Sequence, residues 1–206
     1  RLRKLASGDQ LSDIASIILP VRALSPKSIL IYSCEEVIGD GILKLSFAQQ
    51  VRRRFPEARI TWLAGTGKTV YASILKPVAV RFIDEVIENA GVGDKTLQLF
   101  TKWSLLPGRK FDLIIDTQRL VARTMIVKRI PHDTFISGTA NFFFSDVKPP
   151  KNFEPDPSFV GGLIDMLDLV SPRPADDGAN VFDLSQEYRA AAAELLPSGA
   201  IYIGIA

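Results

Sequence analysis

The chain has 206 residues, 47% of them hydrophobic and 9% aromatic, which is enough to bury the core of one large domain or slightly more. A formal net charge of +2, without a stripe of Lys and Arg interleaved with aromatic residues, argues against a nucleic-acid-binding protein. One cysteine and one histidine exclude a disulfide framework and a zinc-site spacing, and they fit a reducing compartment. No apolar run approaches the ~18 residues of a membrane-spanning helix, so we do not expect an integral membrane protein.

Residues 1–27 are predicted to form a helical extension before the main domain. Apolar residues between positions 11 and 18 fall on one helical face, and Asp9 or Ser12 is placed to cap the start. Two interpretations stay open for this helix. It packs on the body of the domain, or it lies on a membrane, drawn to anionic lipid by the basic residues at positions 1, 3 and 4.

Short apolar strands and helices alternate along the rest of the chain. The predicted strands are residues 28–34, 58–64, 82–87, 111–116 and 134–137, with a closing strand at 200–206. The predicted helices follow the loop ending at 38–41, pass through residues 97–103, follow residue 118, and occupy 159–170 and 186–196. In the first helix, the residues expected on the buried face are Ile42, Leu45, Val51 and Phe55.

This alternation predicts an α/β fold with a doubly wound, mostly parallel, Rossmann-like sheet that carries helices on both faces. Ligands of such sheets bind beyond the carboxyl ends of the strands. The first strand delivers residues 34–41 to that edge, and the strand at 111–116 delivers residues 116–119 to it. We therefore expect Asp40 and residues 116–119 to face the same crevice.

Two glycine-containing stretches resemble nucleotide-binding motifs but lack an essential position. The run at residues 65–69 ends like a phosphate loop, yet Trp62 stands where the first glycine is needed, so a plain turn before a helix is expected. Gly39 and Gly41 begin a dinucleotide fingerprint, yet Lys44 occupies its third glycine position. The sequence also lacks an Asp-x-Asp pair, which disfavours a transferase that holds a metal against a diphosphate.

Asp40 is the candidate for chemistry at this edge. A carboxylate in the first turn of a helix is stabilised by the helix dipole and by free backbone N–H groups. It can accept a proton from a hydroxyl nucleophile, or it can simply cap the helix. Cys34, far in sequence from the single histidine, is read as a small buried hydrophobic residue and not as a nucleophile.

Two segments resemble glycosyltransferase family 9, the ADP-heptose:lipopolysaccharide heptosyltransferases. The first runs from the strand at residues 29–31 through Ile38-Gly39-Asp40-Gly41 to residues 52–63, and the second is the strand at residues 111–116 with Thr117-Gln118-Arg119-Leu120. The second is similar to the family's strand ending in Asp-x-Gln-Gly-Leu. Together the two segments place the resemblance over about residues 28–138.

The resemblance implies an inverting, metal-independent GT-B enzyme, with no cofactor, that moves a sugar from a nucleotide sugar such as ADP-heptose to a lipopolysaccharide-core or other lipid-linked glycan. Asp40 would be the general base, and the expected substrate-binding residues are Gly39, Gly41, Gln118, Arg119 and Arg123. Residues 28–196 would be the acceptor-binding domain, and residues 197–206 the first strand of a nucleotide-sugar domain. The expected location is cytoplasmic or peripheral at the inner face of the membrane, and this fragment alone is expected to be inactive.

The sequence departs from the family pattern at the two loops that approach the crevice. Residues 33–36 make the first loop one residue longer, and Arg119 replaces a glycine. Arg119 and Arg123, expected one helical turn apart, either clamp a phosphate or carboxylate or lie on a solvated helix face. These departures keep open a second interpretation, in which the chain is a non-catalytic binding or assembly module.

Overall fold

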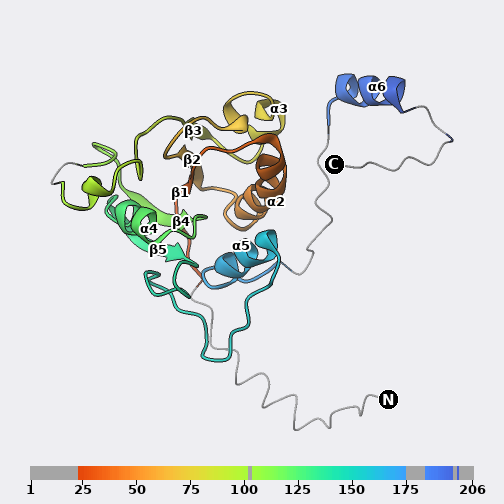
Figure 1. Cartoon of the computed structure of the whole chain (residues 1–206). Helices are drawn as coiled ribbons and strands as arrows, with labels where there is room; N and C mark the ends of the chain where they lie inside the picture. The colour runs from red at the N-terminus through yellow and green to blue at the C-terminus, as the bar shows by residue number, and fades with distance from the viewer. Residues whose placement is uncertain (1–22, 102–103, 175–183, 197–198, 200–206) are drawn as a thin grey trace, which may run out of the picture.

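The computed structural model describes residues 23–101, 104–174, 184–196 and 199 (Figure 1). The predicted helix within residues 9–19, the end of the helix predicted through 97–103, and the strand predicted at 200–206 lie outside the described residues.

Five parallel strands form one sheet in the order β3-β2-β1-β4-β5. Their bounds are Ser28–Ser33 for β1, Arg59–Ala64 for β2, Glu85–Ile87 for β3, Phe111–Asp116 for β4 and His132–Ser137 for β5. β1 lies at the centre, where Tyr32 is opposite Leu63 of β2 on one side and opposite Asp116 of β4 on the other. The predicted parallel, Rossmann-like α/β fold is confirmed.

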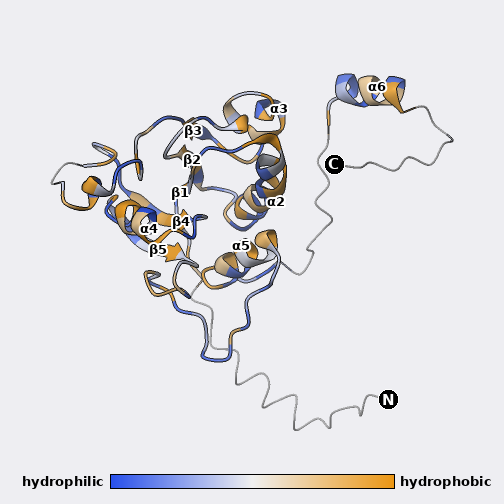
Figure 2. Ribbon diagram, in the orientation of Figure 1, coloured by the Kyte–Doolittle hydropathy of each residue, from blue (hydrophilic) through white to orange (hydrophobic). Residues whose placement is uncertain are grey.

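Alternate residues of the central strands belong to two separate hydrophobic cores, because successive side chains point to opposite faces of the sheet. Ile29 and Ile31 belong to the core that contains α2 and α5, whereas Leu30 and Tyr32 belong to the core that contains α4. Figure 1 shows α2 and α5 on one side of the sheet and α4 on the other, and Figure 2 shows α5 coloured largely hydrophobic where it packs. The sheet is therefore doubly wound.

Helices α2 to α5 pack around the sheet or follow its strands, and α6 lies later in the chain. The α-helices are α2 at Ile38–Arg54, α3 at Lys76–Ala79, α4 at Val121–Val127, α5 at Phe159–Asp168 and α6 at Gln186–Leu195. Two single turns of 3₁₀-helix, η1 and η2, occupy Val70–Ala72 and Thr96–Leu99. Every residue of α6 is exposed.

The strand predicted at residues 82–87 is shorter than expected. Phe82 and Ile83 both donate their backbone N–H groups to the carbonyl of Ala79, so they complete the turn after α3. Asp84 then accepts the backbone N–H of Ile60 through its side chain, at 2.7 Å. Asp84 also donates its own backbone N–H to the carbonyl of Ile60, and the paired register with β2 covers Glu85–Ile87.

The helix predicted through residues 97–103 is reduced to the single turn η2 within the described residues. Leu97 and Phe100 are 70% and 80% exposed, whereas Leu99 packs against the core on the α4 side of the sheet. The side chain of Gln98 instead accepts the backbone N–H of Gly93 at 2.8 Å. A short 3₁₀ turn, tied to the preceding loop, results.

Two predicted helix starts are wrong. The first helix begins at Ile38, inside the stretch predicted as loop, and its buried positions include Gly41, Leu45 and Ala48, which leaves Ile42 on the other face and 51% exposed. α4 begins at Val121 after an extended Leu120, so Arg119 precedes the helix and does not share it with Arg123.

Candidate functional site

The candidate site lies where the winding of the chain changes direction. From β1 the chain moves outward through β2 to β3, and then it crosses to the other side of β1 to form β4 and β5. The carboxyl ends of β1 and β4 therefore diverge into two loops that leave a crevice, which is the usual ligand position in such sheets. A cavity of about 310 Å³ occupies this place, lined by Cys34, Glu35, Asp40, Lys44, Thr117, Gln118, Arg119 and Phe159. We call it the Asp40 cavity.

Asp40 is exposed in the first turn of α2, and within the described residues its carboxylate makes no hydrogen bond or ion pair. A hydrogen bond from η1 anchors this turn, because the Tyr71 hydroxyl donates to the carbonyl of Gly41 at 2.7 Å. Tyr71 is buried against Trp62, with ring centroids 4.7 Å apart, and burial raises the pKa of its phenol well above the ordinary value. The carboxylate is thus presented to the cavity on a fixed support.

The two glycines beside Asp40 have different surroundings. A side chain on Gly41 would place its Cβ 2.2 Å from Cγ2 of Val70 and 3.1 Å from Cδ1 of Leu75, so α2 and the η1 segment approach each other through this glycine. A Cβ on Gly39 would meet nothing within 4 Å. Neither glycine is among the residues that line the Asp40 cavity.

Lys44, which lines the cavity, is part of a buried ion pair that sequence reasoning missed. Lys44 and Glu36 are 5% and 4% exposed, and Lys44 Nζ lies 3.2 Å from Glu36 Oε1 and donates to Ser33 Oγ at 2.8 Å. Trp62 Nε1 donates to the other oxygen of Glu36 at 3.3 Å. The only signal in the sequence is that Lys44 follows Asp40 by four residues, which places both side chains on one side of a helix.

The loop after β4 is fixed by Asp116, which is buried. The hydroxyls of Thr124 and Ser137 donate to its Oδ2 at 2.6 and 2.9 Å, and the backbone N–H of Gln118 donates to its Oδ1 at 2.9 Å. Burial raises the pKa of Asp116 to about 6, and these hydrogen bonds oppose that effect. Asp116 is therefore a structural group that sets the path of residues 117–119.

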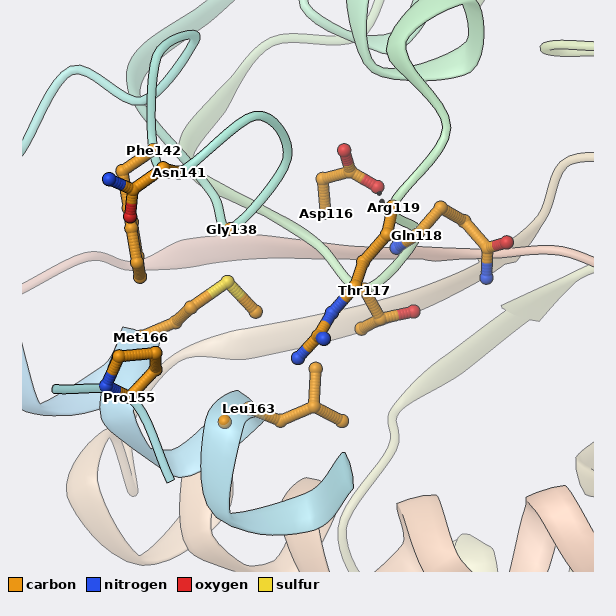
Figure 3. A pocket seen from close by; sticks show the side chains of 11 residues that line it. Asp116, Thr117, Gln118, Arg119, Gly138, Asn141, Phe142, Pro155, Leu163 and Met166 are labelled. Atoms are coloured by element: carbon orange, nitrogen blue, oxygen red, sulfur yellow. Dashed lines mark hydrogen bonds between the residues drawn. The ribbon is translucent and has the colours of Figure 1, made fainter. Parts of the chain in front are cut away.

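Arg119 stands between the Asp40 cavity and a second, smaller cavity of about 90 Å³. Figure 3 shows its side chain extending from the loop towards α5, near Leu163. The approach is close enough that a Cβ on Gly162 of α5 would lie 2.9 Å from Arg119 Nη2. Within the described residues the guanidinium makes no hydrogen bond or ion pair, and Thr117 and Gln118 line the same two cavities.

Arg123 lies behind the cavity wall. It is half-buried on α4, and its Nη1 donates to Sγ of Cys34 at 2.9 Å. Cys34 lines the Asp40 cavity, whereas Arg123 does not. The structure thus brings Asp40, Gln118 and Arg119 to one cavity and leaves Gly39, Gly41 and Arg123 around it.

The stretch at residues 65–69 is a turn that leads from β2 into η1. The side chain of Thr69 accepts the backbone N–H of Tyr71, and its own N–H donates to Glu88 at 2.7 Å. No group of three or more His, Cys, Asp or Glu that suits a metal ion occurs among the described residues. None of the described helices is both long enough and apolar enough to span a membrane.

No family model matches the sequence, and a search of curated proteins gave no significant match. Among solved structures, a family 9 glycosyl transferase from Veillonella parvula superposes with a TM-score of 0.54 at 18% identity, over 83% of this chain and 49% of that chain. The chain folds like part of a GT-B glycosyltransferase. It spans about half the length of the Veillonella protein.

Two structures of the E. coli heptosyltransferase WaaC also match. The complex with ADP has a TM-score of 0.48 at 18% identity, over 75% of this chain and 51% of that chain. The complex with ADP-2-deoxy-2-fluoro heptose has a TM-score of 0.47 at 17% identity, over 78% and 56%.

Proposed function

We propose that this chain is the acceptor-binding part of a glycosyltransferase in which Asp40 is the general base. The observation that carries the proposal is the position of Asp40 in this fold. Its exposed carboxylate lines a cavity at the switch point of the sheet, on a turn anchored by Tyr71, and Gln118 and Arg119 line the same cavity. A group placed this way can take a proton from an alcohol that enters the cavity.

In the proposed reaction an acceptor hydroxyl attacks the anomeric carbon of a nucleotide sugar. A new C–O bond forms as the bond from that carbon to the nucleotide diphosphate breaks, and the hydroxyl proton moves to Asp40. The attack comes from the face opposite the leaving group, so the configuration of the anomeric carbon inverts. The charge of the leaving diphosphate would be met by the rest of the enzyme without a metal ion.

The substrates are proposed from the resemblance of the two sequence segments to family 9. The donor would be a nucleotide sugar such as ADP-heptose, and the acceptor a lipopolysaccharide-core or other lipid-linked glycan at the inner face of a membrane. An anionic acceptor suits Arg119, because an arginine can bind a phosphate or a carboxylate with two parallel hydrogen bonds. Arg123, turned towards Cys34, would support the wall of the cavity and would not share this clamp.

The proposal is tested by transfer of heptose from ADP-heptose to a lipopolysaccharide-core acceptor, with a protein that contains this chain and the nucleotide-sugar half. We expect product with inverted anomeric configuration by NMR, and a rate that a chelator such as EDTA does not lower. Product with retained configuration would contradict the direct attack assisted by Asp40.

The second candidate is a non-catalytic module that keeps the sheet. It is favoured by the Glu36–Lys44 pair, which places two buried charges that neutralise each other between β1 and α2. Calorimetric titration of the same protein with ADP-heptose separates the two candidates. Saturable binding supports the transferase, and no binding supports the module.

A further inference from the structure

One wall of the Asp40 cavity combines an aromatic ring with a fixed ammonium group. Phe159, the first residue of α5, is 39% exposed and lines the Asp40 cavity. Lys44 Nζ lies 6.0 Å from the centre of its ring. A half-exposed phenyl ring in a polar cavity leaves apolar surface in water, which a bound molecule with an apolar face would cover.

Lys44 has an unused hydrogen-bond donor in this arrangement. An ammonium group carries three N–H donors, and Lys44 directs one to Ser33 and one to Glu36. No oxygen of the described residues accepts the third. Because the two occupied donors and Trp62 fix the pair in place, a ligand oxygen can be bound without ordering a flexible lysine.

We propose that Phe159 and Lys44 form a subsite for one sugar ring of the acceptor. The C–H face of the ring packs on Phe159, and a ring hydroxyl accepts the third N–H of Lys44. Asp40, one helical turn before Lys44, lies beside a neighbouring hydroxyl of the same ring. This inference deepens the proposed function, and the acceptor class it names is a pyranoside with a hydroxyl-bearing edge and an apolar face.

Charge in the cavity favours a sugar over a simple anion. Lys44 is balanced by Glu36, and the exposed carboxylates of Asp40 and Glu35 accompany the single unpaired guanidinium of Arg119. A free phosphate would meet more negative than positive charge here, because Asp40 and Glu35 outnumber Arg119 once Lys44 is balanced by Glu36. A polyol uses both the carboxylate acceptor and the ammonium donor, and it needs no net charge.

The test is saturation-transfer difference NMR on the chain, without nucleotide sugar, using two matched probes. Methyl α-D-glucopyranoside is neutral, and methyl α-D-glucopyranosiduronic acid differs only by a carboxylate at C6. We expect Phe159→Ala to lower the affinity for both probes about fivefold, as the loss of one aromatic contact does. Phe159→Trp keeps a platform and retains binding.

The matched control is Phe143→Ala, because Phe143 is also an exposed phenylalanine, at 74%, and lies outside the cavity. The Phe143→Ala variant should bind both probes with the affinity of the natural chain. Lys44 is tested as Glu36→Gln/Lys44→Met, since removing Lys44 alone would strand a buried carboxylate. Loss of about tenfold in affinity is expected for both probes in this double variant.

Equal binding by Phe159→Ala and the natural chain, or no saturation transfer to either probe, would overturn the subsite. If the subsite binds the probes but the longer protein transfers no heptose, the inference stands and the transferase proposal fails. Arg119→Gln is expected to lower the affinity for the uronic acid and to leave the affinity for the neutral glucoside unchanged. Equal weakening of both probes by Arg119→Gln would contradict the division of roles between Arg119 and Lys44.

Discussion

Gly41 occupies a place where the backbone of α2 touches the η1 segment, next to the proposed base. Gly41→Ala would force its Cβ to 2.2 Å from Val70, so the first turn of α2 or the η1 segment must move. We expect a loss of about 1–3 kcal/mol in the free energy of unfolding, as in other overpacked sites. Urea denaturation measures this change.

Gly39→Ala is the matched control, two residues away in the same turn. Its Cβ would meet nothing within 4 Å, and alanine is a better helix former than glycine. We expect unchanged or slightly higher stability. If Gly41→Ala proved as stable as Gly39→Ala, the close packing of α2 on η1 would be contradicted.

Asp116 predicts a pH dependence of stability. Burial raises its pKa in the folded chain to about 6, above the ordinary 3.8, so the folded state holds the proton more tightly than the unfolded state does. The stability gained from that proton is present below about pH 4 and is lost as the pH rises through about 6. Between about pH 4.5 and 7.5 this loss amounts to about 2 kcal/mol.

Asp116→Asn removes the titration and keeps a side chain of the same shape. Its amide can still accept the N–H of Gln118, and the hydroxyls of Thr124 and Ser137 can turn to accept its N–H groups. Urea unfolding at the two pH values should show a smaller loss for the variant than for the natural chain. If the free energy of unfolding fell equally between the two pH values in the variant and in the natural chain, Asp116 would not be the source of the pH dependence.

At the residue scale, the sequence predicted Asp40 at the entry to a helix, because a strand, a glycine-containing connection and an amphipathic run follow one another there, and the helix itself starts two residues earlier, at Ile38. It did not reveal Lys44 or Phe159. Lys44 is a charged residue on a buried face, which hydrophobic periodicity counts as a break in the pattern. Phe159 joins the cavity only because α5 packs beside α2, about 120 residues later in the chain, and no local signal encodes that contact.

Among the elements, α5 has a direct link to the site, because Phe159 of the Asp40 cavity and Leu163 of the smaller cavity both lie on it. Its start is capped by Ser158, whose hydroxyl accepts the backbone N–H of Gly161 at 3.1 Å. We expect Ser158→Ala to lower the free energy of unfolding by about 1 kcal/mol. Ser158→Asp supplies another good capping oxygen and should retain stability in the same urea titration. An unchanged free energy of unfolding for Ser158→Ala would show that the cap does not stabilise α5.

Element boundaries followed the sequence where burial alone decides them and departed from it where side chains bond to the backbone. β4 matches its prediction residue for residue, because Phe111 and the apolar run at residues 113–115 are buried and the run ends at a carboxylate. β3 is shortened because the Asp84 side chain takes the N–H of Ile60, which apolar pattern does not foresee. α4 starts late because the segment before it is held by other hydrogen bonds. Asp116 accepts the backbone N–H of Gln118, and the Thr117 hydroxyl donates to the carbonyl of Tyr32 in β1.

At the scale of the whole molecule, the order of the sheet decides where chemistry can occur. The alternation of strands and helices predicted a parallel sheet. In the order β3-β2-β1-β4-β5, the loops that follow β1 and β4 diverge from each other and leave a crevice between them. Each of the two sequence segments that resemble family 9 supplies one of these loops. The proposed base, the loop of Gln118 and Arg119, and the proposed sugar platform all meet there.

The central claim is that Asp40 removes the proton of the acceptor hydroxyl, and the direct test is the rate of sugar transfer by Asp40→Asn in a protein that contains both halves. We expect kcat to fall about 10²–10⁴-fold with the KM for the nucleotide sugar unchanged. Asp94→Asn, at an exposed aspartate outside the Asp40 cavity, should keep the natural rate. A kcat for Asp40→Asn equal to that of Asp94→Asn would contradict the claim.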